Sequence, residues 1–178
     1  LDNAIEKNVK NFSDFKNKKI EEICVCLLER DRHIEIINSL KKIGAKIKLI
    51  SDGDVAGAIM VSDSKYNVDI FVGIGGGPEG VIVASALDAM NCNFQGRFIF
   101  ATDKDKVRAK QMGIKDLNKK YQINEIVKGD SIFCATGITS GDLINGLKKD
   151  GSNFHTETLI THKSENLVSI IHKKYISK

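Results

Sequence analysis

The residues of this chain that could do chemistry lie in short polar segments, each of which follows an apolar stretch. Arg30 and Arg32 come after one such stretch, and Asp52 and Asp54 follow the next. Guanidinium groups bind phosphate oxygens bidentately, and carboxylates bind sugar hydroxyls or a hard divalent cation. Each residue also has an ordinary role, because Asp-Gly-Asp is a common turn and surface arginines are usually solvated.

The most informative segment spans 68–90 and reads VDIFVGIGGGPEGVIVASALDAM. Its order predicts a strand, a glycine-rich loop at 73–77 (the glycine loop) and a helix with Pro78 at the first position. The unpaired amides at such a helix start form an anion-binding site. Glu79 stands where a phosphate would otherwise bind. It is therefore either a surface residue that complements the helix dipole or a metal ligand beside the phosphate.

A dinucleotide-binding site is a weaker interpretation of the same loop. Gly75, Gly77 and Gly80 match the spacing of that fingerprint, and Asp103 follows the next predicted strand, where a ribose-binding acid could lie. However, Glu79 would repel an uncompensated pyrophosphate. At least two predicted strands also precede the loop, whereas the fingerprint normally opens its domain.

The elements that must position these residues alternate between strands and helices. Strands are predicted at 23–28, 46–50, 97–101 and 131–135, with the first and last of them buried. Helical patterns cover 2–19, 34–44, 55–61 and the segment from Thr102 or Asp103 to Met112. The tail at 154–175 predicts a hairpin that turns near 164–166. We therefore expect an α/β fold with a mainly parallel sheet flanked by helices and an antiparallel C-terminal hairpin.

This architecture would bring the polar segments together, because ligands bind beyond the carboxyl ends of the strands in an open parallel sheet. Four strand ends would meet at one edge. They carry the arginine pair, the Asp-Gly-Asp segment, the glycine loop with Glu79, and a last segment made of Thr136, Gly137, Ile138 and Thr139. Because all four segments would lie at one edge, a shared binding or catalytic function explains them better than four separate ordinary roles do.

Composition narrows the class of protein. The chain has 178 residues, of which 42% are hydrophobic and 28% charged, as is typical of one soluble globular domain. The sequence has neither an apolar run long enough for a membrane span nor the apolar core of a signal peptide, so we expect a cytoplasmic protein. A net charge of +4 from scattered lysines, without interleaved aromatic residues, does not indicate nucleic-acid binding. The four cysteines, at 24, 26, 92 and 134, form no CxxC pair and indicate neither a zinc site nor a disulfide framework.

Nearly the whole chain resembles the class II fructose-1,6-bisphosphatases, some of which also act on sedoheptulose 1,7-bisphosphate. The matching segments are LISDGDVAGAI at 49–59, VGIGGGPEGVIVASAL at 72–87, FQGRF at 94–98 and ATGITSGDLI at 135–144. The tail, with TETLITHKSENLVSIIH, is similar to the closing strands of that family. The resemblance implies a sugar-phosphatase-type layered fold, of which residues 1–178 would be the C-terminal portion.

The resemblance also implies roles for single residues. The substrate-binding residues would be Arg30, Asp31, Arg32, Asp52, Gly53, Asp54 and Gly76. Glu79 would be a ligand of the catalytic Mn²⁺ or Mg²⁺ ion. Family members commonly carry proline where this chain has Asp31, and an acid at that position weakens the local positive field.

The remaining metal-binding carboxylates and the groups that activate water belong to an N-terminal half of the family. Because the chain starts at Leu1 and offers one clear metal carboxylate, we expect that half to be missing here and this piece alone to be inactive. The implied reaction is metal-dependent hydrolysis of the 1-phosphate of fructose 1,6-bisphosphate, as in gluconeogenesis. The implied partners are a small-molecule sugar bisphosphate and further copies of the protein in a homo-oligomer, with neither nucleic acid nor membrane. The alternative is a non-catalytic nucleotide- or sugar-phosphate-binding module.

Overall fold

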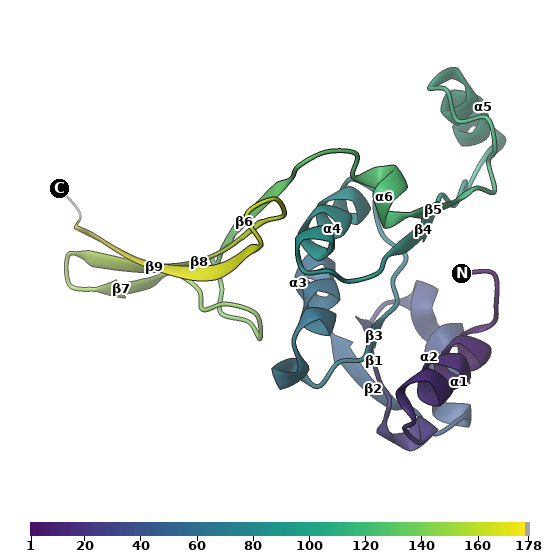
Figure 1. The fold of residues 1–178 in the computed structure, drawn as a ribbon, viewed down its shortest axis with the longest axis horizontal. Helices are drawn as coiled ribbons and strands as arrows, with labels where there is room; N and C mark the ends of the chain where they lie inside the picture. The colour runs from purple at the N-terminus through teal and green to yellow at the C-terminus, as the bar shows by residue number, and fades with distance from the viewer. Residues whose placement is uncertain (177–178) are drawn as a thin grey trace.

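A three-stranded parallel sheet carries most of the candidate residues (Figure 1). The computed structural model describes residues 1–176. In it β1 (Cys24–Leu28) lies between β2 (Lys46–Ile50) and β3 (Ile70–Phe71), and both neighbours run parallel to it. Val25 and Leu27 on one face and Cys26 on the other are fully buried, as expected for a central strand covered on both faces. The α/β class and the parallel sheet predicted from the sequence are confirmed.

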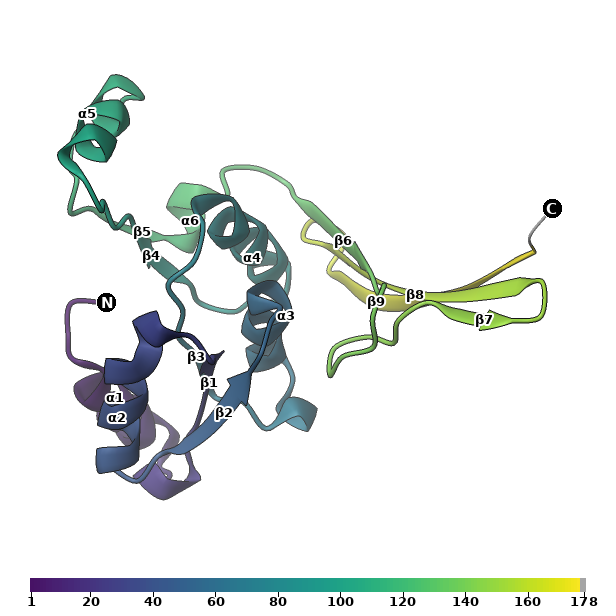
Figure 2. The same ribbon diagram turned by 180° about the vertical axis from the view of Figure 1, so that it is seen from behind.

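Helices cover both faces of this sheet (Figures 1 and 2). On one face, α1 (Ile5–Lys16) and α2 (Ile34–Lys42) pack against β1 through a cluster that includes Val9, Leu27 and Leu40, all fully buried. On the other face lie α3 (Asp54–Ile59) and α4 (Gly77–Ala89), which contact each other. All four helices fall where the hydrophobic pattern of the sequence placed them.

A second sheet is antiparallel. It contains β6 (Ile132–Thr136), β7 (Lys148–Asp150), β8 (Asn153–His162) and β9 (Leu167–Ile176). The predicted C-terminal hairpin is confirmed, because β8 and β9 pair along their full lengths around a turn at 163–166. β6 was expected beside the parallel strands, and this prediction was wrong: β6 pairs antiparallel with β8. Its expected burial was also wrong in part, because Phe133 is buried whereas Ile132 is 66% exposed.

Helix α4 joins the two sheets. Phe133 and Leu159 of the antiparallel sheet share an apolar cluster with Ala86 of α4. Beside it, Lys163 Nζ donates to both carboxylate oxygens of Asp88, at 2.6 and 2.7 Å. Asp88 is buried near the C-terminal end of α4, where the helix dipole disfavours an anion, so the lysine both neutralises this carboxylate and fixes the hairpin turn to the helix.

A narrow arm projects from the body (Figures 1 and 2). Its base is an antiparallel ribbon of β4 (Gln95–Arg97) and β5 (Lys120–Gln122), followed by α6 (Ile123–Ile126), and its end is α5 (Asp103–Gln111). The strand predicted at 97–101 is observed earlier, at Gln95–Arg97, and pairs only with β5. The cap predicted for α5 is confirmed, because Thr102 Oγ1 accepts from the amide of Asp105.

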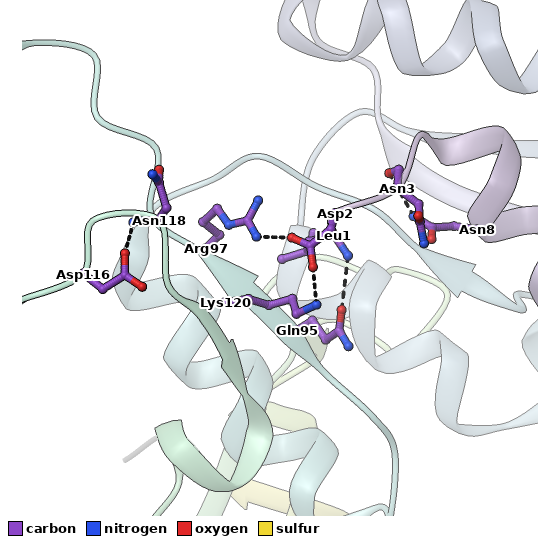
Figure 3. Close-up of polar contacts among 9 residues, drawn as sticks. All are labelled: Leu1, Asp2, Asn3, Asn8, Gln95, Arg97, Asp116, Asn118 and Lys120. Atoms are coloured by element: carbon purple, nitrogen blue, oxygen red, sulfur yellow. Dashed lines mark hydrogen bonds and ion pairs between the residues drawn. The ribbon is translucent and has the colours of Figure 1, made fainter.

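The start of the chain is tied to the base of this arm (Figure 3). Arg97 and Lys120 lie opposite each other in the β4–β5 ribbon, and both donate to the carboxylate of Asp2. These bonds, the one from Lys120 first, lower the pKa of Asp2 to about 2. The anion separates two cations that would otherwise repel across the ribbon. Within residues 1–176, no helix has the length and apolar character that crossing a membrane requires.

Candidate functional site

The loops after β1, β2 and β3 leave the same edge of the parallel sheet, as the sequence predicted for three of the four strand ends. The loop after β1 contains a short 3₁₀ helix, η2 (Asp31–His33), and it reaches the glycine loop directly. Arg32 Nε donates to the carbonyl of Ile74 at 2.6 Å. Because Nε is used in this bond, the two terminal nitrogens of Arg32 remain as the end of the guanidinium that can meet an anion.

Arg30 lies beside the Asp-Gly-Asp segment. Its Nη2 is 3.8 Å from Asp52 Oδ1, and its Nη1 donates to the carbonyl of Glu29 at 3.0 Å. Both partners of the ion pair are accessible, with side-chain exposures of 40% for Arg30 and 93% for Asp52. Asp31 is exposed at the start of η2 and lines, with Arg30, a shallow hollow of about 320 Å³ on the α2 side. Arg30 and Asp31 are therefore both accessible to a ligand at this edge of the sheet.

The Asp-Gly-Asp segment forms the turn that starts α3. Gly53 has φ of 82°, a left-handed conformation that favours glycine, and its amide donates to Asp52 Oδ1 at 2.9 Å. Asp54 is the first residue of α3, and its Oδ1 accepts from the amide of Val55 at 3.0 Å. Its other oxygen faces the glycine loop, because a Cβ placed on Gly75 would lie 3.0 Å from Asp54 Oδ2.

Glu79 belongs to the first turn of α4. The helix begins at Gly77, one residue earlier than predicted, so Pro78 is its second residue and Glu79 its third. The side chain of Glu79 folds back over Gly76, and a Cβ on Gly76 would overlap Glu79 Oε2. Gly76 has ordinary extended angles, so any side chain there would meet the Glu79 carboxylate in its present position rather than strain the backbone.

These contacts make the glycine loop the centre of the site. Arg32 donates to the carbonyl of Ile74, and the carboxylates of Asp54 and Glu79 border the space beside Gly75 and Gly76, so three different elements meet at residues 74–76. The unpaired amides at the start of α4 lie at the same place and favour an anion. The site thus combines a guanidinium and helix amides, which suit phosphate, with carboxylates, which suit a hydroxyl or a cation.

Two predicted members of the site are not there. The segment 136–139 leaves β6 in the antiparallel sheet, and Thr136 Oγ1 is bonded to Thr158 Oγ1 at 2.8 Å across that sheet. Asp103 begins α5 at the far end of the arm, and its carboxylate pairs with Lys106 of the same helix at 2.8 Å. The prediction of a fourth strand end was therefore wrong, and Asp103 does not serve a nucleotide at the glycine loop.

One residue that no sequence signal indicated is His33. It closes the charged run Glu-Arg-Asp-Arg-His, which suggests a solvated loop, yet its side chain is completely buried. Its ring contacts Leu28 at the end of β1 and Ile74 in the glycine loop. Burial of a polar ring behind two arginines depends on the paths of three loops, which local sequence does not encode.

The donor set fits part of the coordination shell of a hard cation. Carboxylate oxygens such as those of Glu79 are the ligands that Mg²⁺ and Mn²⁺ prefer. Within the described residues, however, no group of three or more His, Cys, Asp and Glu side chains could hold a metal ion. The described part of the chain therefore offers single carboxylates such as Glu79, and no complete cation site.

The two cysteines of β1, Cys24 and Cys26, are poorly suited to act as nucleophiles. Burial raises the pKa of Cys26 to about 11, and it also raises the pKa of Cys24. A raised pKa disfavours the thiolate, which is the nucleophilic form of cysteine.

Comparison with known proteins gives one consistent result. A family model described as bacterial fructose-1,6-bisphosphatase, glpX-encoded, matches residues 1–175. A protein of Synechococcus sp. (strain JA-2-3B'a(2-13)) is 34% identical over 186 residues, which cover 96% of this chain and 53% of that protein. A protein of Synechocystis sp. (strain ATCC 27184 / PCC 6803 / Kazusa) is 34% identical over 190 residues, covering 98% and 55%. Both are named D-fructose 1,6-bisphosphatase class 2/sedoheptulose 1,7-bisphosphatase. The chain spans about half the length of these curated relatives.

Proposed function

The chain belongs to the family of glpX-encoded bacterial fructose-1,6-bisphosphatases, and on this premise we propose that it supplies the substrate-binding loops and one metal ligand of a metal-dependent bisphosphatase. The reaction is hydrolysis of the 1-phosphate of fructose 1,6-bisphosphate, with Mn²⁺ or Mg²⁺ as the ion. Sedoheptulose 1,7-bisphosphate is the second substrate, since the relatives carry both names.

The observation that carries this proposal is the convergence on the glycine loop. Arg32 donates to the carbonyl of Ile74, while the carboxylates of Asp54 and Glu79 border the space beside the two following glycines. The carboxylates of Asp54 and Glu79 are unfavourable beside a phosphate on its own, because like charges repel each other at short range. A divalent cation held by Glu79 would offset that repulsion, so the arrangement fits a phosphate and a metal together better than a phosphate alone.

Each substrate-binding residue has a distinct task in this proposal. Arg30 and Arg32 hold the phosphate that is not cleaved, because a guanidinium forms two parallel hydrogen bonds with phosphate oxygens. Asp52, Gly53 and Asp54 contact the sugar phosphate at the turn after β2. Asp31 stays within this loop but, as an anion, reduces its positive field.

The reacting end of the substrate lies at the start of α4. Gly76 allows close approach of the substrate to the backbone, and Glu79 holds the metal ion beside it. An ion held there would supply Lewis-acid chemistry, by polarising a phosphoryl group and lowering the pKa of a bound water. The remaining ligands and the groups that orient this water come from the part of the protein outside residues 1–178.

We also propose that the protein acts in the cytoplasm as a homo-oligomer. Support for assembly comes from the antiparallel sheet, where exposed apolar side chains include Ile132 at 66%, Val168 at 52% and Leu167 at 41%. Scattered charge and the absence of interleaved aromatic residues argue against a nucleic-acid partner.

The test is release of phosphate from fructose 1,6-bisphosphate by the full-length protein. We expect turnover with Mn²⁺ or Mg²⁺, loss of turnover with a chelator, and recovery when Mn²⁺ is added back, because one carboxylate cannot hold the ion alone. Residues 1–178 by themselves should give no turnover, with circular dichroism used to check that they fold. Metal-dependent turnover by this piece would show that the ligand set is complete within it. No turnover by the full-length protein with either ion would overturn the proposed function.

A further inference from the structure

His33 is held by backbone groups at both of its ring nitrogens. It is the last residue of η2, and its side chain has 0% exposure. Nδ1 lies 2.8 Å from the carbonyl oxygen of Leu28, the last residue of β1. On the other side of the ring, the amide of Ile74 in the glycine loop donates to Nε2 at 3.0 Å.

These two partners define the state of the ring. A carbonyl oxygen can only accept a hydrogen bond and a backbone amide can only donate one. The ring therefore carries its proton on Nδ1 and accepts at Nε2, which is one specific neutral tautomer. In this state it bridges the end of the central strand and the glycine loop, and neither nitrogen is left to act on a substrate.

The His33 bridge restrains the backbone of the glycine loop between β3 and α4. The last bond between β1 and the segment after β3 runs from the amide of Val72 to Cys26, and the first bond of α4 runs from Gly80 to Gly76. Between these bonds both backbone groups of Ile74 are held by one short turn, since Arg32 donates to its carbonyl and His33 accepts from its amide. Glycine-rich backbone is conformationally free, so these two bonds determine where Gly75 and Gly76 lie.

We propose that His33 is a positioning residue for phosphate and metal binding at the glycine loop. It does not touch the substrate. It acts through Ile74, which restrains the two glycines whose free space Asp54 and Glu79 border, and it keeps the carbonyl of Ile74 in reach of Arg32. The effect of His33 on catalysis rests on the proposed function. The hydrogen bond between His33 Nε2 and the amide of Ile74 does not depend on it.

Two substitutions in the full-length protein separate this role from simple stabilisation. In His33→Asn, the side-chain amide reaches the position of Nδ1, so the bond to Leu28 is kept and the bond to Ile74 is lost. In His33→Gln, the longer side chain brings its amide oxygen to the position of Nε2, so the bond to Ile74 is kept. Each variant loses one buried hydrogen bond, so a purely stabilising residue would respond alike to both.

We expect His33→Asn to lower kcat/KM for fructose 1,6-bisphosphate by roughly tenfold to a hundredfold, the loss typical when a supporting contact behind a site is removed. His33→Gln should stay within about threefold of the unmodified protein at a similar Tm. In hydrogen exchange by mass spectrometry without substrate, peptides that contain Ile74 should exchange faster in His33→Asn than in His33→Gln.

Equal activity of the two folded variants, or equal exchange at Ile74, would overturn the proposal. If neither variant folds, ¹⁵N NMR of the unmodified full-length protein decides, because a His33 ring with its proton on Nε2 would contradict the inferred bond to Ile74. If the full-length protein does not hydrolyse the bisphosphate at all, the proposed function is wrong. The hydrogen-exchange measurement at Ile74 still tests the positioning role of His33.

Discussion

Replacement of Glu79 by glutamine is expected to reduce kcat of the full-length protein by a hundredfold or more while the fold survives. Glutamine keeps the size of the side chain over Gly76 but removes the charge that a cation requires. An ion that activates water and neutralises phosphoryl oxygens contributes several kcal/mol to the transition state, so its loss produces an effect on the order of hundredfold or more. The measurement is turnover across a manganese titration, with circular dichroism to confirm folding.

The control for this substitution is Glu35→Gln. Glu35 is an exposed acid in the first turn of α2, so it shares with Glu79 the favourable position at a helix start but lies outside the glycine loop. If Glu79 only complements the helix dipole, both variants should lose a few tenths to about 1 kcal/mol of stability and keep their activity. Near-normal kcat of Glu79→Gln at ordinary metal concentration would remove Glu79 from the metal site.

Alanine at Arg30 or Arg32 should raise KM for fructose 1,6-bisphosphate by about tenfold or more. A charge-assisted hydrogen bond to phosphate contributes roughly 1.5 to 3 kcal/mol, and each 1.4 kcal/mol corresponds to about tenfold in binding. Arg32→Ala should be the more severe, because it also removes the bond from Nε to Ile74 and so loosens the glycine loop. Steady-state kinetics at fixed metal concentration would separate the change in KM from a change in kcat.

Arg108→Ala is the matched control for the arginines. Arg108 is an exposed residue in the last turn of α5, on the arm, so its removal changes the net charge equally without touching the glycine loop. A KM that stays unchanged in both Arg30→Ala and Arg32→Ala would place the two side chains on the solvated surface. An equal rise in KM in Arg108→Ala would point to general electrostatic attraction of the substrate.

The parallel part of the fold was predictable because its signals are local. The buried run at 24–28, the apolar period of 34–42 and the glycine loop after β3 each occur where the pattern of the sequence placed them. Once three consecutive strands alternate with helices, the polar segments at their ends must meet at one edge. Arg32, Asp54 and Glu79 were therefore expected near one another, and their contacts with residues 74–76 are what the structure adds.

The place of β6 could not be predicted in the same way. A short apolar run such as Ile-Phe-Cys-Ala has the same pattern in a parallel and in an antiparallel strand. What decides its place is the ten-residue pairing partner β8, which lies more than twenty positions later in the chain. The mistaken fourth strand end therefore came from a non-local pairing.

His33 illustrates a second limit of local patterns. The residues just before it, Asp31 and Arg32, are charged and exposed, and its burial goes with the packing of η2 against the glycine loop. The sequence could indicate which residues suit phosphate and metal, but the residue that positions the loop beneath them required the three-dimensional arrangement.

The most direct test of the central claim is to locate manganese and phosphate in crystals of the full-length protein. An anomalous difference map should place Mn²⁺ at coordinating distance, roughly 2.0 to 2.6 Å, from a carboxylate oxygen of Glu79, with a phosphate oxygen as another ligand beside the start of α4. Manganese bound by other residues, with Glu79 beyond coordinating distance and no phosphate at the glycine loop, would contradict the claim that this loop assembles the catalytic site.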